Sequence, residues 1–433
     1  MPELLLLRHR EIPELRRLEV YLAHGGYQAT RKALTTHTPE QLVDMVKASN
    51  LRGRGGAGFP TGMKWSFLPK QSTKPVYLCI NADESEPGTF KDRELMEYDP
   101  HQVLEGIIIS AFAIKCHTAY VYVRGEFTLA IERMEAAIAE ARREGFIGTN
   151  ILGTGFDLEV WMHRGAGAYI CGEETGLIES LEGKRAYPRI KPPFPATHGL
   201  FGCPTIVNNV ETLACVPHIV LRGPEWFRAI GPESSPGPKL YCVSGHVVRP
   251  GTYELPMGTP LREIIYTHAG GIPNGRKLKG VIPGGASMPV FTADEIDVPM
   301  DMDSVQKAGS FLGSAGIMVM DDSVCMVWAL LLLARFFHHE SCGQCTPCRE
   351  GTGWLHKVLM GLEQGDAEPR DVDLLLAIAN NMQGNTICAL ADAAAMPARA
   401  FVTKYRAEFE QPAALGRCPF RPAPEEPRSH AHA

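Results

Sequence analysis

The chain has 433 residues, and its 43 Lys and Arg against 49 Asp and Glu give a formal net charge of −6. This slightly acidic balance argues against nucleic acid as the main partner, because phosphate binding needs a basic surface. Apolar residues make up 45% and charged residues 21%, as in a folded globular protein, and the length suggests about three domains.

The sequence gives no sign of a membrane span or of a targeting leader. The most apolar charge-free stretch, Ser323 to Ala334, is far shorter than the roughly 20 residues that cross a bilayer. The first residues, MPELLLLRHR, lack a basic leader with a long apolar centre. We therefore expect a soluble, untargeted protein with no direct membrane span.

Residues 1–50 are expected to form an N-terminal helical segment. Leu42, Val43 and Val46 recur at helical spacing, with Thr38 and Pro39 in the positions of an N-cap and a first-turn residue.

Residues 51–235 are expected to form an α/β domain, because short β-rich runs alternate with helical patterns. The predicted strands are 76–80, 120–123 and 158–162, and the predicted helices are 102–115 and 127–144. This alternation predicts a sheet with parallel pairing.

The Gly/Pro/Ser-rich run at 231–239 is typical of a linker. Short β runs follow at 240–243, 246–248 and 252–255, then a helix capped by Thr259, and then a strand at 280–282. This succession predicts a small α+β domain over 240–322, of the ubiquitin-like β-grasp kind.

Residues 323–410 are expected to form a helical domain that carries a cysteine cluster. The Pro-rich end of the chain, residues 411–433, is expected to be a disordered tail.

The run CGQCTPC at 342–348 places Cys342, Cys345 and Cys348 two residues apart. Three closely spaced thiolates favour an iron–sulfur cluster over a single tetrahedral zinc, which usually pairs one such motif with a second. The fourth ligand must come from a distance, and Cys388 is the best candidate. Cys325 reads as part of an apolar helix, and Cys418 falls in the expected tail. The alternative is a zinc site completed by His338 or His339.

A glycine-rich stretch, RGRGGAGFPTGMKW at 52–65, contains a G-x-G-x-x-G pattern at Gly53, Gly55 and Gly58. A helical pattern precedes it where a dinucleotide-binding fingerprint requires a strand, so the strict fingerprint does not apply. The glycines would still let backbone N–H groups approach an anion, and Lys64 would add a positive charge. A flexible surface loop is the alternative interpretation.

Three polar loops are expected to line a cofactor crevice in the same domain: NADESEPG at 81–88, GAGAYICGEET at 165–175, and PTIVNNVET at 204–212. Each alone could be a solvated loop. Amides such as those of Asn208 and Asn209 suit the polar edge of a flavin, and carboxylates suit ribose hydroxyls. Lys191 is either part of a solvated basic face or a contact for a pyrophosphate.

Together these motifs, with KPPFPA at 191–196 and HESCGQCTPCREG at 339–351, closely resemble the NADH- and FMN-binding flavoprotein subunit of respiratory complex I, the 51-kDa-type family. The resemblance extends over residues 20–407. It implies a multidomain α/β protein with a Rossmann-like FMN/NADH domain, a ubiquitin-like β-grasp domain and a C-terminal helical bundle that carries one 4Fe-4S cluster.

Carried over residue by residue, the resemblance implies that NADH lies over the flavin, with its adenine stacked on phenylalanine rings. The metal ligands it implies are Cys342, Cys345, Cys348 and Cys388. The cofactor-binding positions it implies are Gly53, Arg54, Gly55, Gly58, Phe59, Lys64, Phe67, Asn81, Asp83, Glu84, Glu86, Tyr169, Gly172, Glu173, Glu174, Lys191, Phe194, Val207, Asn208, Asn209 and Thr212.

The activity implied by the resemblance is hydride transfer from NADH to FMN, followed by single-electron transfer to the cluster and onward to quinone. It needs no catalytic acid or base. The implied partners are other peripheral-arm subunits of complex I, especially the 2Fe-2S thioredoxin-like subunit and the large iron–sulfur subunit, on the cytoplasmic side of the bacterial inner membrane.

Two alternatives remain at this point. One is the diaphorase subunit of an NAD-reducing hydrogenase or formate dehydrogenase; the lack of a second cysteine run in this chain favours complex I over it. The other is a non-catalytic, zinc-stabilised NAD-binding scaffold, which predicts colourless protein instead of bound flavin and a brown iron–sulfur chromophore.

Overall fold

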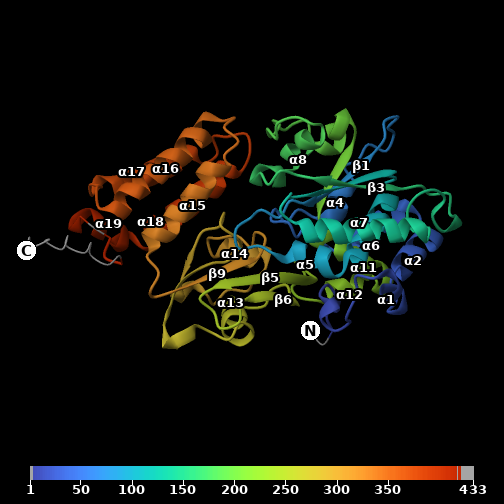
Figure 1. Cartoon of the computed structure of the whole chain (residues 1–433), viewed down its shortest axis with the longest axis horizontal. Coiled ribbons are helices and arrows are strands. Elements are labelled where there is room, and N and C mark those ends of the chain that lie inside the picture. Colours follow the sequence, from blue (N-terminus) through green and yellow to red (C-terminus); the bar gives the residue numbers. More distant parts are fainter. Residues whose placement is uncertain (1–2, 417, 421–433) are drawn as a thin grey trace, which may run out of the picture. The chain divides into compact units, whose positions relative to one another are not determined.

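The computed structural model describes residues 3–416 and 418–420. The chain forms two compact units, of which the first ends at Val319 and the second begins at Met320. The first unit contains two β-sheets with their helices, and the second is helical (Figure 1). Within the described part of the chain, no helix is long and apolar enough to cross a membrane.

The N-terminal segment is helical, as predicted, with α1 at Leu18–Ala23, α2 at Gln28–Thr36 and α3 at Pro39–Ala48. Helix α3 begins with a capping box, in which the Thr38 hydroxyl accepts a hydrogen bond from the Gln41 N–H and the Gln41 side chain accepts one from the Thr38 N–H. Pro39 occupies the first turn, where its missing N–H costs nothing.

The first sheet is parallel throughout and has the strand order β3-β2-β1-β4. Its strands are β1 Tyr77–Ala82, β2 Thr118–Val123, β3 Glu159–Arg164 and β4 Thr205–Asn209. The expectation of a polar loop at 204–212 is wrong, because this stretch is strand β4 followed by helix α10, Val210–Ala214. Ile206 and Val207 are buried there, and their β-branched side chains favour an extended backbone.

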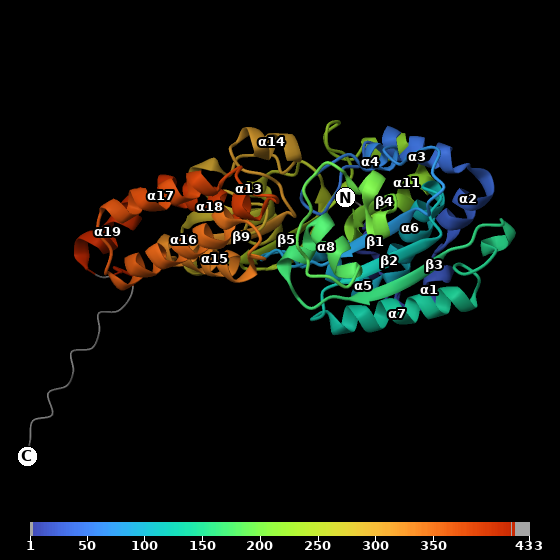
Figure 2. The ribbon, with the colours of Figure 1, turned by 90° about the horizontal axis from the view of Figure 1, so that it is seen from above.

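Helices cover both faces of this sheet (Figure 2). The helices of this region are α4 Thr61–Trp65, α5 Lys91–Tyr98, α6 Pro100–Ala113, α7 Thr128–Arg143, α8 Glu174–Leu181, α9 Pro195–His198, α11 Val216–Arg222 and α12 Pro224–Arg228, together with α10; α11 and α12 pack on other helices. The predicted helices at 102–115 and 127–144 are thus confirmed as α6 and α7, with boundaries shifted by one or two residues.

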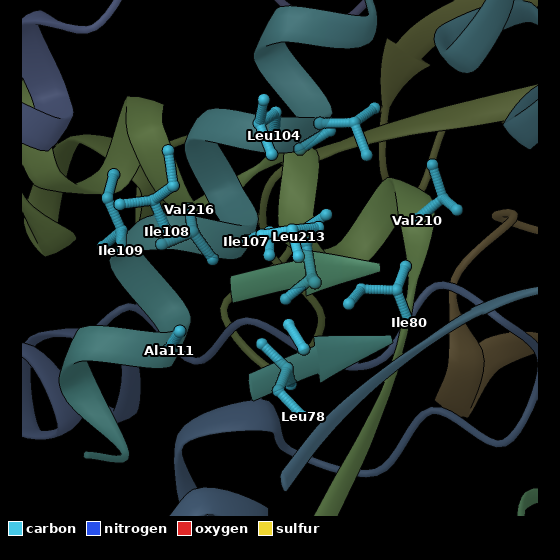
Figure 3. Packing of buried hydrophobic residues seen from close by; sticks show 14 of the residues in the cluster. Leu78, Ile80, Leu104, Ile107, Ile108, Ile109, Ala111, Val210, Leu213 and Val216 are labelled. Carbon is cyan, nitrogen blue, oxygen red and sulfur yellow. The ribbon is translucent and has the colours of Figure 1, made fainter. Parts of the chain in front are cut away.

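Helix α6 lies at the centre of the core and is buried along its length except at Phe112. In Figure 3, Ile107 of α6 lies next to Leu213 of α10, and the β1 side chains Leu78 and Ile80 belong to the same buried cluster. Gly106 permits the close crossing of α6 and α10, because a Cβ atom there would lie 2.1 Å from the Leu213 carbonyl oxygen.

A buried histidine in this core makes the stability of the fold depend on pH. His218 on α11 bonds through Nε2 to Gln102 Oε1 at 2.7 Å, and its burial lowers its pKa from the ordinary value of 6.5 to about 3. Between these two pH values the unfolded chain binds the additional proton, so stability is lost as the pH falls below 6.5.

Below pH 6.5, the free energy of unfolding should fall less steeply with pH in His218→Gln than in the wild type. We expect the slope to decrease by up to about 1.4 kcal/mol per pH unit. Urea midpoints measured from pH 7 to pH 5 would test this. The control is His24→Gln, at an exposed position, which should retain the wild-type slope. Equal slopes in all three proteins would contradict the assignment.

The second sheet is mixed and has the strand order β6-β5-β9-β7-β8. Its strands are β5 Pro238–Gly245, β6 Gly251–Pro256, β7 Leu278–Ile282, β8 Phe291–Thr292 and β9 Gly316–Asp321. β5 pairs antiparallel with β6 and parallel with β9, and β7 pairs antiparallel with β8. Helix α13, Leu261–Glu263, continues as a π-helical turn, Ile264–His268, and α14 spans Met302–Lys307.

Two local predictions in this region are wrong. Residues 246–248 do not form a strand, because β5 already ends at Gly245 and the chain bends there to reach β6. Thr259 does not cap the following helix; its hydroxyl instead donates to the Pro256 carbonyl.

The second unit consists of α15 Met326–Glu340, α16 Thr346–Gln364, α17 Arg370–Met382, α18 Leu390–Lys404 and α19 Arg406–Leu415. The expected tail therefore begins too early, since α19 continues through Gln411 to Leu415. Cys418 is also buried, at 3% exposure. Residues 421–433 lie outside the described part of the chain.

Candidate functional site

The candidate cofactor site lies at the carboxyl ends of β1 and β4. These two strands are parallel neighbours, with Asn81 opposite Asn209 at their ends. Their chain order places a topological switch point between them, because β2 and β3 continue the sheet on the other side of β1. Open α/β sheets bind ligands outside the carboxyl ends of strands at such a point.

The glycine-rich loop packs against the junction of β4 and α10. The Arg54 N–H donates to the Thr212 hydroxyl at 2.8 Å, and a Cβ atom on Gly55 would lie 3.0 Å from the Asn209 Cβ. Gly58 has a φ of +65°, and a Cβ atom there would lie 2.3 Å from the Met302 sulfur. The backbone of this loop is thus held close to β4, which disfavours the flexible-loop interpretation and leaves space only for glycine.

The Arg54 side chain makes structural hydrogen bonds. It is fully buried and donates to the carbonyls of Pro236 and Pro238 at 2.7 and 3.2 Å. The guanidinium thus holds the glycine-rich loop to the segment at the start of β5, while the Arg54 backbone bonds to Thr212.

Two lysines and two glutamates form an ion network beside the loop. Lys64 of α4 contacts Glu174 at 2.9 Å and the Val207 carbonyl at 3.0 Å, and Lys191 contacts Glu173 and Glu174 at 2.8 and 3.0 Å. Burial opposes ionisation of Glu174, but the two lysines outweigh it and lower its pKa.

Glu173 also stabilises the start of the helix that follows it. Its carboxylate accepts the N–H groups of Thr175 and Gly176 and so caps helix α8. The network therefore joins α4, β4, α8 and the segment before α9 around one side of the crevice.

A second set of contacts brings the turn at Tyr169–Gly172 to the end of β1. The Asn81 amide donates to the Gly172 carbonyl at 2.8 Å. A Cβ atom on Gly172 would lie 3.5 Å from the Asp83 carbonyl oxygen. Because Gly172 has no side chain, the space beside the Asp83 backbone stays open.

Glu86 connects the crevice to the second sheet. Its carboxylate accepts hydrogen bonds from the Tyr169 hydroxyl and from the Ser287 N–H, both at 2.7 Å, and burial raises its pKa. Gly285 permits this contact, since a Cβ atom there would lie 2.5 Å from the Glu86 Cγ. Sequence reasoning missed the 284–287 turn, whose only signal is the pair Gly284-Gly285.

Several predicted binding residues make hydrogen bonds to other parts of the protein. Glu84 accepts the N–H groups of Asp92 and Arg93 and caps α5; burial, together with Asp92, raises its pKa to about 7. Asn209 caps α10 and donates to Asp92 at 2.6 Å. Asn208 accepts the indole N–H of Trp65 at 2.8 Å.

A buried ion cluster that the sequence did not indicate lies directly behind these residues. Glu211 contacts Lys239 at 2.7 Å and Lys91 at 2.9 Å, and Lys91 contacts Asp92 at 2.8 Å. Burial opposes ionisation of Glu211, but the two lysines lower its pKa; burial lowers the pKa of Lys239 to about 8. The cluster ties β5 of the second sheet to α5 and α10 of the first.

The predicted aromatic surface is exposed. Phe59 and Phe67 are 46% and 53% exposed, with ring centroids 5.9 Å apart. Phe194, on the segment before α9, is 58% exposed. Exposed rings of this kind offer flat faces to an aromatic ligand.

The candidate metal centre lies in the turn between α15 and α16. Cys345 is the N-cap residue of α16, Cys348 is in its first turn, and Cys342 precedes them. The Ile387 N–H donates to the Cys345 sulfur at 3.4 Å, which brings the neighbour of Cys388 to this turn. Ser341 bonds to the Cys348 sulfur at 3.2 Å. A helix N-terminus and N–H···S bonds both stabilise an anionic cluster.

These cysteines and the neighbouring histidines are not gathered as the ligands of a single zinc ion are. In tetrahedral zinc, neighbouring sulfurs lie about 3.8 Å apart, whereas in a 4Fe-4S cluster each sulfur binds a different iron and the sulfurs lie further apart. Among the residues the structure describes, no group of three drawn from these cysteines and His338 or His339 has its ligand atoms within 4.8 Å of one another. His338 instead stacks on His356 of α16, with ring centroids 5.8 Å apart.

Comparison with known protein families gives three matches along the chain. Residues 46–218 match the Nuo51 FMN-binding domain, residues 240–291 match the SLBB domain, and residues 328–412 match the NADH-ubiquinone oxidoreductase-F iron-sulfur binding region.

Individual relatives match nearly the whole chain. An NADH-quinone oxidoreductase F subunit of Rhizobium meliloti (strain 1021) is 61% identical over 420 residues, covering 97% of this chain and 100% of that protein. The NADH-quinone oxidoreductase F subunit of Mycobacterium tuberculosis (strain ATCC 25618 / H37Rv) is 52% identical, covering 96% and 94%. The crystal structure of an NAD+-reducing NiFe-hydrogenase in the air-oxidized state aligns with a TM-score of 0.81 at 36% identity, over 95% of this chain and 67% of that one.

Proposed function

This chain belongs to the family of NADH-quinone oxidoreductase F subunits, and from that premise we propose which of its residues bind FMN, NADH and the iron–sulfur cluster. It is the NADH dehydrogenase subunit of respiratory complex I. FMN supplies the acceptor for a hydride from NADH, and a 4Fe-4S cluster supplies the one-electron carrier on the route to quinone. The protein provides alignment, electrostatics and exclusion of water.

We propose that FMN is held in the crevice at the ends of β1 and β4. The observation that carries this proposal is the convergence of the glycine-rich loop, Asn81, the Tyr169–Gly172 turn and β4 on one switch point. Its walls would be Gly53, Arg54, Gly55, Gly58, Lys64, Asn81, Asp83, Glu84, Gly172, Glu173, Glu174, Val207, Asn208, Asn209 and Thr212. The glycines leave room for the ligand, and the backbone N–H groups supply donors.

We propose that NADH binds over the flavin, with its adenine against Phe59, Phe67 and Phe194 and with Glu86, Tyr169 and Lys191 nearby. The exposure of the three rings supports this arrangement. Lys191 would act as a fixed positive charge, since Glu173 and Glu174 raise its pKa despite its burial.

The carboxylates in this network predict a preference for NADH over NADPH, because they would repel an additional ribose phosphate. We expect kcat/KM to favour NADH by at least about tenfold, which is worth about 1.4 kcal/mol. Glu174→Gln leaves Lys64 and Lys191 less neutralised and should shift the ratio toward NADPH. The control Glu135→Gln removes an exposed carboxylate on α7 and should leave the ratio unchanged; equal use of both nucleotides by the wild type would contradict the prediction.

We propose Cys342, Cys345, Cys348 and Cys388 as the cluster ligands. The hydrogen bond from the Ile387 N–H to the Cys345 sulfur supports the choice of Cys388 as the fourth, because Ile387 is the residue next to Cys388.

We propose a division into an N-terminal helical segment at 1–50, an FMN/NADH domain at 51–235, a β-grasp domain at 240–322 and a 4Fe-4S helical domain at 323–410. The β-grasp assignment is supported by the central parallel pairing of β5 with β9, flanked by the antiparallel pairs β5–β6 and β7–β8.

We propose that the partners are peripheral-arm subunits of complex I, especially the 2Fe-2S thioredoxin-like and large iron–sulfur subunits, on the cytoplasmic side of the bacterial inner membrane. The relatives that carry the NADH-quinone oxidoreductase name support the assignment. The alternative assembly is an NAD-reducing hydrogenase or formate dehydrogenase. Affinity purification of the native assembly, followed by mass spectrometry, separates the two by which subunits are recovered.

The function is tested on the purified full-length chain. We expect yellow-brown protein that releases FMN on denaturation, about four iron atoms per chain, and an electron paramagnetic resonance signal after reduction with NADH. Colourless protein that contains zinc and no iron would contradict the proposal and support the scaffold alternative.

A further inference from the structure

A second group of metal-ligating side chains lies in the helical unit, apart from the candidate cluster ligands. Cys325, Glu363 and Cys418 are 9%, 4% and 3% exposed. Their ligand atoms all lie within 4.8 Å of one another, which holds for no other group of three or more Cys, His, Asp or Glu in the described part of the chain.

The distances within this group are those of a tetrahedral metal site. The two sulfurs are 3.7 Å apart, and the Cys325 sulfur is 3.9 Å from a Glu363 carboxylate oxygen. Sulfur ligands on one zinc ion lie about 3.8 Å apart, which follows from a Zn–S bond of about 2.3 Å. A disulfide would instead need an S–S bond of about 2.05 Å.

The three residues come from three separate elements. Cys325 is the N-cap residue of α15, Glu363 is in the last turn of α16, and Cys418 follows α19. Glu363 lies 363 − 348 = 15 residues after Cys348 on the same helix, which is roughly 22 Å at 1.5 Å per residue. The group is therefore a centre distinct from the one at the start of α16.

We propose that Cys325, Glu363 and Cys418 bind a zinc ion that fastens the chain after α19 to the start of α15 and the end of α16. A water molecule or the second Glu363 oxygen completes four-coordination. Binding replaces the two thiol protons, which pass to solvent, and involves no change of oxidation state. Thiolate and carboxylate ligands together suit zinc better than magnesium or calcium, which take oxygen ligands.

Elemental analysis of the full-length chain tests this proposal. We expect about one zinc per chain in the wild type, with the iron content accounted for separately by the cluster. Cys418→Ser and Glu363→Gln should each lower the zinc content at least fivefold while leaving iron and FMN unchanged. Glu363→Gln conserves the shape of the side chain, so its zinc content can still be measured if Cys418→Ser folds poorly.

The matched control is Cys116→Ser, which alters another buried cysteine, in the first unit, and should retain full zinc. A cluster-ligand variant, Cys345→Ala, should lose iron and keep zinc, so that failure here is distinguishable from failure of the proposed function. Zinc-free wild-type protein, zinc retained in Cys418→Ser, or a Cys325–Cys418 disulfide peptide found by mass spectrometry of unreduced protein would each overturn the proposal.

Discussion

Replacing Cys345 by alanine is expected to abolish the 4Fe-4S cluster while FMN stays bound. Cys345 is the N-cap residue of α16, and its sulfur accepts the Ile387 N–H, so it connects the 342–348 turn to the 386–388 segment. Loss of its thiolate removes one ligand and the contact that brings the fourth ligand close. The proposed FMN residues all belong to the unit that ends at Val319, and the cysteines belong to the other.

The measurements are iron content, the paramagnetic signal of the reduced protein and flavin released on denaturation. In Cys345→Ala we expect iron and signal near background and flavin close to one per chain. Cys203→Ala, at a buried position outside the second unit, should keep both. Simultaneous loss of flavin from folded Cys345→Ala protein would show that the two sites are not independent.

Replacing Glu211 by alanine is expected to destabilise the first unit by roughly 3–5 kcal/mol, the usual cost of breaking a buried ion pair. Glu211, Lys91 and Lys239 are all at most 1% exposed, and each lysine contacts Glu211 within 3 Å. Without the carboxylate, Lys239 lies buried beside a second positive charge. The Leu240 N–H also loses its acceptor, Glu211 Oε1 at 2.8 Å.

Urea denaturation followed by flavin fluorescence and by circular dichroism measures this effect. The matched comparison is Glu40→Ala, which breaks the Lys115–Glu40 pair, whose side chains are both 66% exposed. Such surface pairs contribute at most about 1 kcal/mol. Equal destabilisation by the two substitutions would refute the view that the cluster is a structural connection between the sheets.

The parts of the fold that local pattern determines were predictable. Thr38 with Pro39 marks the start of α3, and the alternation of β runs and helices indicates the parallel sheet. Strand β4 was missed because Asn208 and Asn209 make its end look like a polar loop. Only the pairing of Asn81 with Asn209 shows that these amides lie at the end of a strand.

The parts of the site that depend on contacts distant in sequence were not predictable. The Glu86–Ser287 contact spans 201 residues, and Cys325 and Cys418 are 93 residues apart. Cys325 was expected inside an apolar helix but is its N-cap, and Cys418 was expected in a tail but is buried. The cysteine run at 342–348 was recognisable because its spacing is local.

The buried Arg54 side chain has a consequence for biogenesis. The loop that approaches β4 is secured by carbonyl groups at Pro236 and Pro238, more than 180 residues later in the chain. When only the first sheet has left the ribosome, the two carbonyl groups that hold the proposed FMN loop have therefore not yet been synthesised. The proposed FMN loop can thus take its final position only after residues 236–238 have been synthesised.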